Sequence, residues 1–136
     1  MQKVEIDKII QIVIERIPSV QAIYLFGSQA TGMNSVSSDV DVAFLTSFDC
    51  GINSLEVYEV QMQLEIELGK DVDFVHLNQA STVFQFEITT TATHLYVKDA
   101  SLVLQYETLI LSMYQRLQEE RKDIINEIIS SGKVYA

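Results

Sequence analysis

The sequence predicts an α/β or α+β fold: a small mixed β-sheet flanked by helices, followed by a long C-terminal helical segment. Short apolar runs of strand length alternate along the chain with stretches of helical periodicity. The single proline and several glycines stand where these stretches end. With 136 residues, 48% of them hydrophobic, the chain is long enough and apolar enough for one domain with a real core.

The first elements are a helix and two strands. Residues 4–17 are amphipathic, and Pro18 ends this helix because the residue before a proline is biased away from helix. Val20–Phe26 is the first apolar strand, and Asp39–Leu45 is the second. Between them lies a turn and loop rich in Ser, Thr, Asn and Gly.

A second helix and a third strand follow. The helix is expected over Ser54–Leu68, with Gly69 as its C-terminal cap. The third strand is expected over Asp71–Leu77. The helix residues expected to face inward are Leu55, Tyr58, Met62, Ile66 and Leu68.

The last third of the chain is mainly helical. Ser81 is placed to cap a short helix over residues 82–90, and His94–Val97 is a short fourth strand. Asp99 then caps a stretch from Ala100 to about Ile129 that forms one long helix or two with a bend, and Gly132 ends it. We therefore expect a single domain over residues 1–136, with a core of about 1–98 and a C-terminal helical segment of about 99–131. The pattern leaves the strand order open.

The chemistry of the chain is concentrated after the first strand. Gly27 lets the backbone turn sharply, and Ser28 offers a hydroxyl and an N–H to a phosphate oxygen. Ten residues later come Asp39 and Asp41, which share one face of the second strand because strand side chains alternate. Adjacent carboxylates repel each other, and a divalent cation shared with a nucleotide's phosphates removes that repulsion.

A divalent-cation site of this kind usually needs a third carboxylate from a neighbouring strand, and the third strand offers two candidates. Asp73 lies between Val72 and Phe74, where an acid is costly unless a metal binds it. Asp71 lies beside Lys70 at the strand edge, where solvent can satisfy it. We choose Asp73 and keep Asp71 as the alternative.

Together, Gly27-Ser28, the ten-residue spacing and Asp39-x-Asp41 resemble the signature of the DNA polymerase beta-like nucleotidyltransferase superfamily. The short chain is most similar to the minimal nucleotidyltransferase (MNT) antitoxins of HEPN–MNT toxin–antitoxin pairs, over about residues 1–115. This resemblance implies the nucleotidyltransferase fold, with carboxylates clustered at the strand ends. Many relatives carry an arginine directly after the serine, and Gln29 here removes that cation from the phosphate site.

The resemblance also implies an activity: a Mg²⁺-dependent transfer of AMP from ATP to a tyrosine of a cognate HEPN ribonuclease toxin, which neutralises the toxin. The implied catalytic and metal-binding residues are Asp39, Asp41 and Asp73, and the implied nucleotide-binding residues are Gly27, Ser28, Asp39 and Asp41. Two alternatives stay open: an antitoxin that caps the toxin by contact alone, and a small-molecule nucleotidyltransferase of the aminoglycoside-modifying kind. The sequence also leaves open the nucleotide, the acceptor residue and the stoichiometry.

Composition bounds the partners and the compartment. The net charge of −10 disfavours direct nucleic-acid binding and suits a basic protein partner. No apolar run approaches the length of a membrane span, the charged N-terminus does not resemble a signal peptide, and the one cysteine, Cys50, fits a reducing cytoplasm. His76 and His94 are far apart in the sequence and are expected to be ordinary structural histidines rather than zinc ligands.

Overall fold

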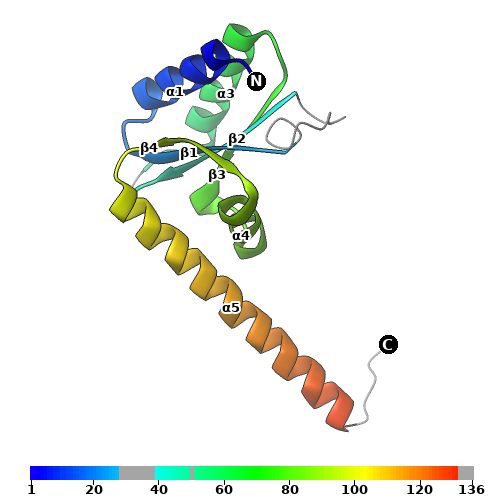
Figure 1. Cartoon of the computed structure of the whole chain (residues 1–136). Helices are drawn as coiled ribbons and strands as arrows, with labels where there is room; N and C mark the ends of the chain where they lie inside the picture. The colour runs from blue at the N-terminus through cyan, green and yellow to red at the C-terminus, as the bar shows by residue number, and fades with distance from the viewer. Residues whose placement is uncertain (28–38, 50, 132–136) are drawn as a thin grey trace.

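Within the described residues, 1–27, 39–49 and 51–131, four strands form one mixed sheet with helices on both faces (Figure 1). The structure is a computed structural model. In chain order the elements are α1 (Lys3–Arg16), β1 (Val20–Phe26), β2 (Val40–Thr46), α3 (Ser54–Leu68), β3 (Val72–His76), the short 3₁₀ helix η1 (Leu77–Gln79), α4 (Thr82–Thr91), β4 (Thr93–Val97) and α5 (Ala100–Ser131). The predicted fold class is confirmed.

The strands lie in the order β3-β2-β1-β4. β1 pairs antiparallel with both β2 and β4, whereas β2 and β3 run parallel and are joined through α3. Parallel neighbours need such a crossover connection. β1 and β2 are the central strands, and nearly all their residues are buried, which is why both appear in the sequence as continuous apolar runs.

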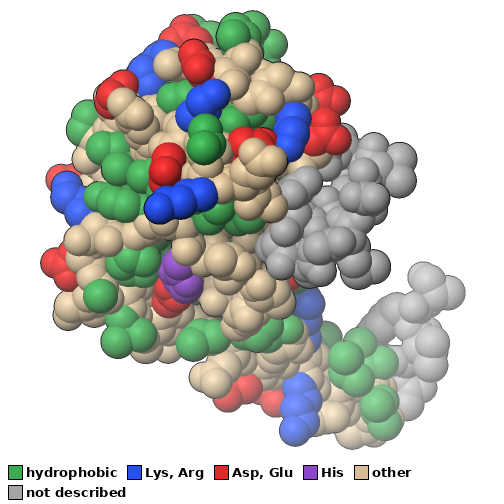
Figure 2. All heavy atoms as spheres, turned by 45° about the horizontal axis from the view of Figure 1, so that its top comes forward, with side chains coloured by type: hydrophobic (Ala, Val, Ile, Leu, Met, Phe, Trp, Pro, Cys, Tyr) green, Lys and Arg blue, Asp and Glu red, His purple; other side chains and the backbone are tan. Residues whose placement is uncertain are grey.

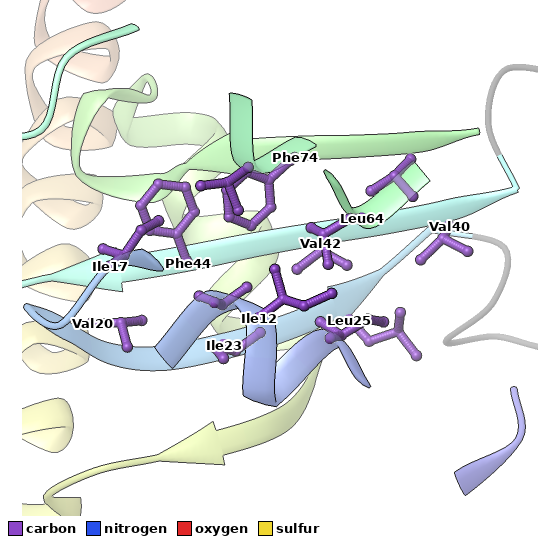
Figure 3. Close-up of a cluster of buried hydrophobic side chains, with 14 residues drawn as sticks. Ile12, Ile17, Val20, Ile23, Leu25, Val40, Val42, Phe44, Leu64 and Phe74 are labelled. Carbon is purple, nitrogen blue, oxygen red and sulfur yellow. The ribbon is translucent and has the colours of Figure 1, made fainter. Parts of the chain in front are cut away.

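The main core lies between the sheet and the pair α1 and α3, as the close-up in Figure 3 shows. Phe44 of β2 stacks on Phe74 of β3, with ring centroids 4.5 Å apart. A second apolar cluster lies on the opposite face, under α4 and α5. It is made of Ala22, Tyr24, Ala43, Leu45, Leu77, Ile88, Val103 and Tyr106.

Three predicted caps are confirmed. Gly69 ends α3 in the left-handed region, with φ 66°. Ser81 accepts a hydrogen bond from the Phe84 amide at the start of α4. Asp99 Oδ1 accepts from the amides of Ser101 and Leu102, 3.0 and 3.2 Å away, and so satisfies two donors at the start of α5.

The predicted inward stripe of α3 is wrong for four of its five members. The side chains of Leu55, Tyr58, Met62 and Ile66 are exposed, the last at 78%. The helix turns Val60 and Leu64 into the core instead, with Val57 and Leu68 packed beside them. The helix carries apolar residues on two faces, so periodicity alone did not distinguish the buried face from the exposed one.

Three strands also differ from their predicted bounds. β2 covers Val40–Thr46 rather than Asp39–Leu45, β3 covers Val72–His76 rather than Asp71–Leu77, and β4 starts at Thr93 rather than His94. Leu77 instead opens η1, a 3₁₀ turn that the sequence analysis missed.

The C-terminal stretch is one helix, α5, about 48 Å long at a rise of about 1.5 Å per residue. Its first half packs on the sheet, and its second half extends away from the domain (Figure 1). The predicted end at Gly132 lies outside the described residues. In the described part of the chain, no helix combines the length and the apolar character needed to cross a membrane.

Candidate active site

The candidate site lies at one end of the sheet, where three strand ends meet. β1 finishes there at Phe26 and Gly27, and β2 and β3 both begin there. This follows from the pairing, because β1 is antiparallel to β2 and β2 is parallel to β3. The topology thus brings Gly27 close to the aspartates of two other strands.

Asp41 and Asp73 are direct neighbours in the parallel register of β2 and β3. Both lie on the face of the sheet that α4 and α5 cover. Asp41 lies two residues before Ala43 and four before Leu45, so it shares the face of β2 on which these members of the second apolar cluster lie. Asp41 is buried, whereas the Asp73 side chain is open to solvent because β3 is an edge strand. Asp73 is therefore less enclosed than its apolar sequence neighbours led us to expect.

The two carboxylates influence each other electrostatically. Partial burial raises the pKa of Asp73 above its usual value, and the negative charge of Asp41 raises it further. Each effect disfavours the charged form of Asp73. Adjacent hard oxygen donors with crowded negative charge are the ligands that Mg²⁺ prefers, so this pair fits a divalent cation.

Gly27 is required by the position of Asp41. Its φ of 72° lies in the left-handed region, and a Cβ on this residue would collide with Asp41 Oδ2. Only glycine lets the chain turn at the end of β1 while leaving the Asp41 carboxylate in place. The predicted turn at Gly27 is thus explained by contact with a predicted acid.

Asp39 and Asp71 take a different position from the Asp41–Asp73 pair. Asp39 lies just before β2 and is exposed, and with Asp71, Glu65 and Lys70 it lines an open hollow beside the end of α3. Lys70 forms an ion pair with Glu5, with Nζ and Oε2 2.8 Å apart, and this contact lowers the pKa of Glu5. The lysine that lines this hollow is therefore already paired with Glu5.

The structure thus brings together two of the three predicted metal ligands, Asp41 and Asp73. Leaving aside residues 28–38, 50 and 132–136, no group of three or more His, Cys, Asp or Glu side chains is arranged to hold a metal ion. Ser28 and Gln29 lie outside the described residues, as does the predicted turn and loop after them.

Aromatic side chains border the carboxylate pair. Phe26 is the register partner of Asp41 across β1 and β2. Phe84 of α4 meets the Phe26 ring edge-on, with centroids 5.7 Å apart. Phe26, Asp41 and Asp73 therefore form a row across three strands, with α4 packed against its apolar end.

His76 points to the face of β3 opposite to Asp73, where its ring meets Phe44. Its ring stacks on Phe44, with centroids 4.7 Å apart, and Nε2 lies 2.8 Å from Thr46 Oγ1. Burial lowers the pKa of His76, and a hydrogen bond with Asn78 opposes this effect in part. The residue is a half-buried structural histidine on the face that α1 and α3 cover.

His94 belongs to a polar network that the sequence analysis missed. Its Nε2 lies 2.8 Å from Glu107 Oε1, and the Tyr24 hydroxyl donates to the same oxygen over 3.3 Å. Burial and the nearby Glu107 charge raise the pKa of Tyr24. Since these residues come from β1, β4 and α5, no local pattern could have revealed the network, which fastens α5 to the sheet.

A pocket of about 240 Å³ lies at the opposite end of the sheet, between the ends of β2 and β3 and the first half of α5. Its polar lining includes Thr46, Asn78 and Gln85, which are hydrogen-bonded to one another or to the backbone. These groups hold η1 against β2. The pocket is separate from the carboxylate pair and shares no residue with it.

Comparison with known proteins places this geometry in context. The family profile described as polymerase beta, nucleotidyltransferase matches residues 7–101. The chain is 34% identical over 136 residues to the protein adenylyltransferase MntA of Shewanella oneidensis, covering 100% of this chain and 96% of that protein.

Two solved structures are similar along nearly the whole chain. One is a toxin–antitoxin complex with AMP-PNP, at 34% identity and a TM-score of 0.78, covering 91% of this chain and 98% of that one. The other is a tri-AMPylated Shewanella oneidensis HEPN toxin in complex with an MNT antitoxin, at 32% identity and a TM-score of 0.76, covering 95% and 99%.

Proposed function

Because the chain belongs to the polymerase beta nucleotidyltransferase family, we propose that it is an antitoxin that transfers AMP from ATP to a tyrosine hydroxyl of a HEPN-type toxin. This modification neutralises the toxin. The observation that carries the proposal is the likeness to the adenylyltransferase MntA over the full length of this chain. The similar complexes, one with AMP-PNP and one with an AMPylated toxin, support the same reaction and the same kind of partner.

The proposed reaction joins the tyrosine oxygen to the α-phosphorus of ATP and releases pyrophosphate. Gly27 and Ser28 would bind the triphosphate, Asp41 and Asp73 would hold Mg²⁺ at the strand ends, and Asp39, just before β2, would complete the ligand set. Asp73 also accepts the hydroxyl proton, because it lies beside Asp41 on the open edge strand, where an acceptor can reach it. When bound, Mg²⁺ neutralises charge on the triphosphate and on the leaving pyrophosphate.

The toxin is needed to complete the site. The exposed carboxyl of Asp73 leaves this end of the sheet accessible to water, and in-line positioning is a large part of phosphoryl-transfer catalysis. A docked protein excludes water and brings its own hydroxyl into line. We therefore expect little transfer to free small molecules, including aminoglycosides.

The test is AMP transfer to the purified cognate toxin with labelled ATP and Mg²⁺, read by intact mass. The native chain should add whole AMP units. The variants Asp39→Asn, Asp41→Asn and Asp73→Asn should each slow transfer by at least about 100-fold, the effect of losing one electrostatic contact to the transition state. Asp71→Asn is the matched control and should retain transfer.

Each result has a distinct meaning. If the toxin is neutralised without gaining AMP, the result would support capping by contact and refute neutralisation by AMP transfer. Loss of transfer in Asp71→Asn but not in Asp73→Asn would move the third carboxylate to Asp71. An unmodified toxin together with adenylylated aminoglycosides would refute the protein acceptor.

We place the protein in the cytoplasm. Its proposed substrate ATP is present there, and the compartment keeps a single cysteine reduced. Its net charge of −10 favours association with a basic partner surface. Direct contact with nucleic acid is not part of the proposal, because such contact draws most of its affinity from cationic residues.

A further inference from the structure

The pocket at the end of the sheet opposite the carboxylate pair takes no part in the proposed reaction. Its volume is about 240 Å³, and it lies between the ends of β2 and β3 and the first half of α5. An apolar cavity of about 150 Å³ is enough to hold one benzene ring. This pocket therefore has room for a flat molecule of two fused rings.

One side of the pocket is apolar. Leu45 and Ile110 are buried there, whereas Leu109 and Met113 of α5 are 45% and 44% exposed. Aliphatic and thioether side chains of this kind pack well against the face of an aromatic ring. The partly exposed pair leaves the pocket open to a ligand from solvent.

The other side is polar, and its geometry is fixed within the protein. The Thr46 amide donates to Asn78 Oδ1 and Asn78 Nδ2 donates to the Thr46 carbonyl, both over 2.9 Å. Gln85 Nε2 donates to the Leu77 carbonyl over 2.8 Å, which sets the direction of its amide and leaves Oε1 as an acceptor. A ligand would therefore meet a preorganised wall.

Two further polar side chains line the pocket and are available to a ligand. Neither the Ser47 hydroxyl nor the Gln79 amide forms a hydrogen bond with another residue that the structure describes. A glutamine amide presents a donor and an acceptor side by side. This pair matches the amino group and the adjacent ring nitrogen of adenine.

The pocket carries no formal charge. Figure 2 shows acidic and basic side chains spread over one face of the molecule. In the described part of the chain, however, no Lys, Arg, Asp or Glu lines this pocket. His76 lines it, and burial lowers the pKa of His76, so its ring is neutral at pH 7. An ionic group would lose water here without gaining a counter-charge, which favours an uncharged ligand.

We propose that this pocket is a second binding site, separate from the nucleotide site, for an uncharged purine base with the hydrogen-bonding edge of adenine. The faces of the base pack against the apolar side, and its edge meets the amides of Gln79 and Gln85. An apolar side chain from a partner protein would fill the same space but would leave these amides without partners, which disfavours it. The site does not depend on the proposed reaction.

Adenine itself is the probe, titrated into the full-length chain and followed by calorimetry and by NMR. It should bind saturably at millimolar concentrations or below. Indole has two fused rings of similar size but lacks the hydrogen-bonding edge, so it should bind at least about tenfold more weakly. Excess AMP-PNP with Mg²⁺ should leave adenine bound, because the carboxylate pair lies at the other end of the sheet.

Three variants locate the site. Leu109→Trp puts a larger ring into the pocket from a half-exposed position and should weaken adenine binding at least about tenfold. Gln79→Ala removes an exposed amide and should weaken binding by about tenfold at an unchanged melting temperature. Leu111→Trp is the matched control: Leu111 is 39% exposed and does not line the pocket, so binding should be kept.

A native chain that binds no adenine at millimolar concentrations would overturn the proposal. So would indole that binds as tightly as adenine, or adenine binding that survives in Leu109→Trp. Displacement of adenine by AMP-PNP with Mg²⁺ would assign it to the nucleotide site instead. If adenine does not bind and Leu109→Trp weakens association with the toxin, the pocket belongs to the toxin contact.

Discussion

Asp41 and Asp73 have different surroundings although they are register neighbours. Asp41 is buried against Gly27, and Asp73 lies on the exposed edge strand. Partial burial and the charge of Asp41 raise the pKa of Asp73 above its usual value. A pair of this kind costs stability in the free protein, and that cost should be measurable as a dependence on pH.

For Asp73 the sign follows from the raised pKa. The folded state holds its proton to a higher pH than the unfolded state does, so the free energy of unfolding falls as pH rises through the folded pKa, above the reference value of 3.8. We expect Asp73→Asn to remove this decline and to raise the free energy of unfolding at pH 7 by about 0.5 kcal/mol, a size suited to a solvent-screened charge.

Urea unfolding at a series of pH values measures the effect. The comparison is with Asp71→Asn, which removes a carboxylate just outside the strand. A native chain and an Asp73→Asn variant with the same pH dependence would contradict the repulsion.

Gly27→Ala separates backbone strain from the collision with Asp41. The left-handed conformation costs an alanine about 1 kcal/mol, and the added Cβ also pushes the Asp41 carboxylate aside. We expect lower stability together with a loss of AMP transfer.

Gly69→Ala is the control for that experiment, because its φ is similar, at 66°, and a Cβ there would meet nothing within 4 Å. It should lose about 1 kcal/mol of stability and keep its transfer rate. Equal transfer by the two variants would show that the contact between Gly27 and Asp41 has no catalytic consequence.

At the residue scale, the sequence predicted the turn at Gly27 and the carboxylates, because spacing and strand alternation are local properties. It could not show that Gly27 touches Asp41, since that contact depends on how β1 and β2 pair. Nor could it show that Asp73 is exposed, which follows from β3 being the sheet edge.

At the scale of elements, the start of α5 offers a direct test. The Asp99 carboxylate accepts hydrogen bonds from two backbone amides there. Without it, both amides can donate only to water. We expect Asp99→Ala to lower the free energy of unfolding by about 1 kcal/mol in urea. Asp99→Asn retains the acceptor oxygen and should stay close to the native value; an equal loss in both variants would assign the effect to charge rather than capping.

Elements with strong local signals were predicted well. β1 and α3 have the predicted bounds, because each is delimited by a turn former: Pro18 and Gly27 around the strand, Asn53 and Gly69 around the helix. The orientation of α3 was predicted wrongly, since the choice between its two apolar faces is made by packing against the sheet and α1. The strand order was open for the same reason: pairing partners are distant in the sequence.

At the scale of the whole molecule, ligand binding should stabilise the fold. A ligand that binds only the native state raises the free energy of unfolding, by about 2.7 kcal/mol when its concentration is 100 times its dissociation constant. We expect the melting temperature to rise with ATP and Mg²⁺ together, and less with either alone. Asp41→Asn should abolish the rise, and identical midpoints under all conditions would argue against a nucleotide site.

The distal half of α5 has a further consequence for the backbone amides. Beyond Leu117 the helix has no sheet beneath it, and a helical segment of this length without packing is only marginally stable in water. In a dilute monomer its amide protons should exchange with deuterium rapidly, while those of β1 and β2 exchange only on global unfolding. Protection of this segment that appears when the proposed toxin is added would therefore report, amide by amide, where the partner covers the helix.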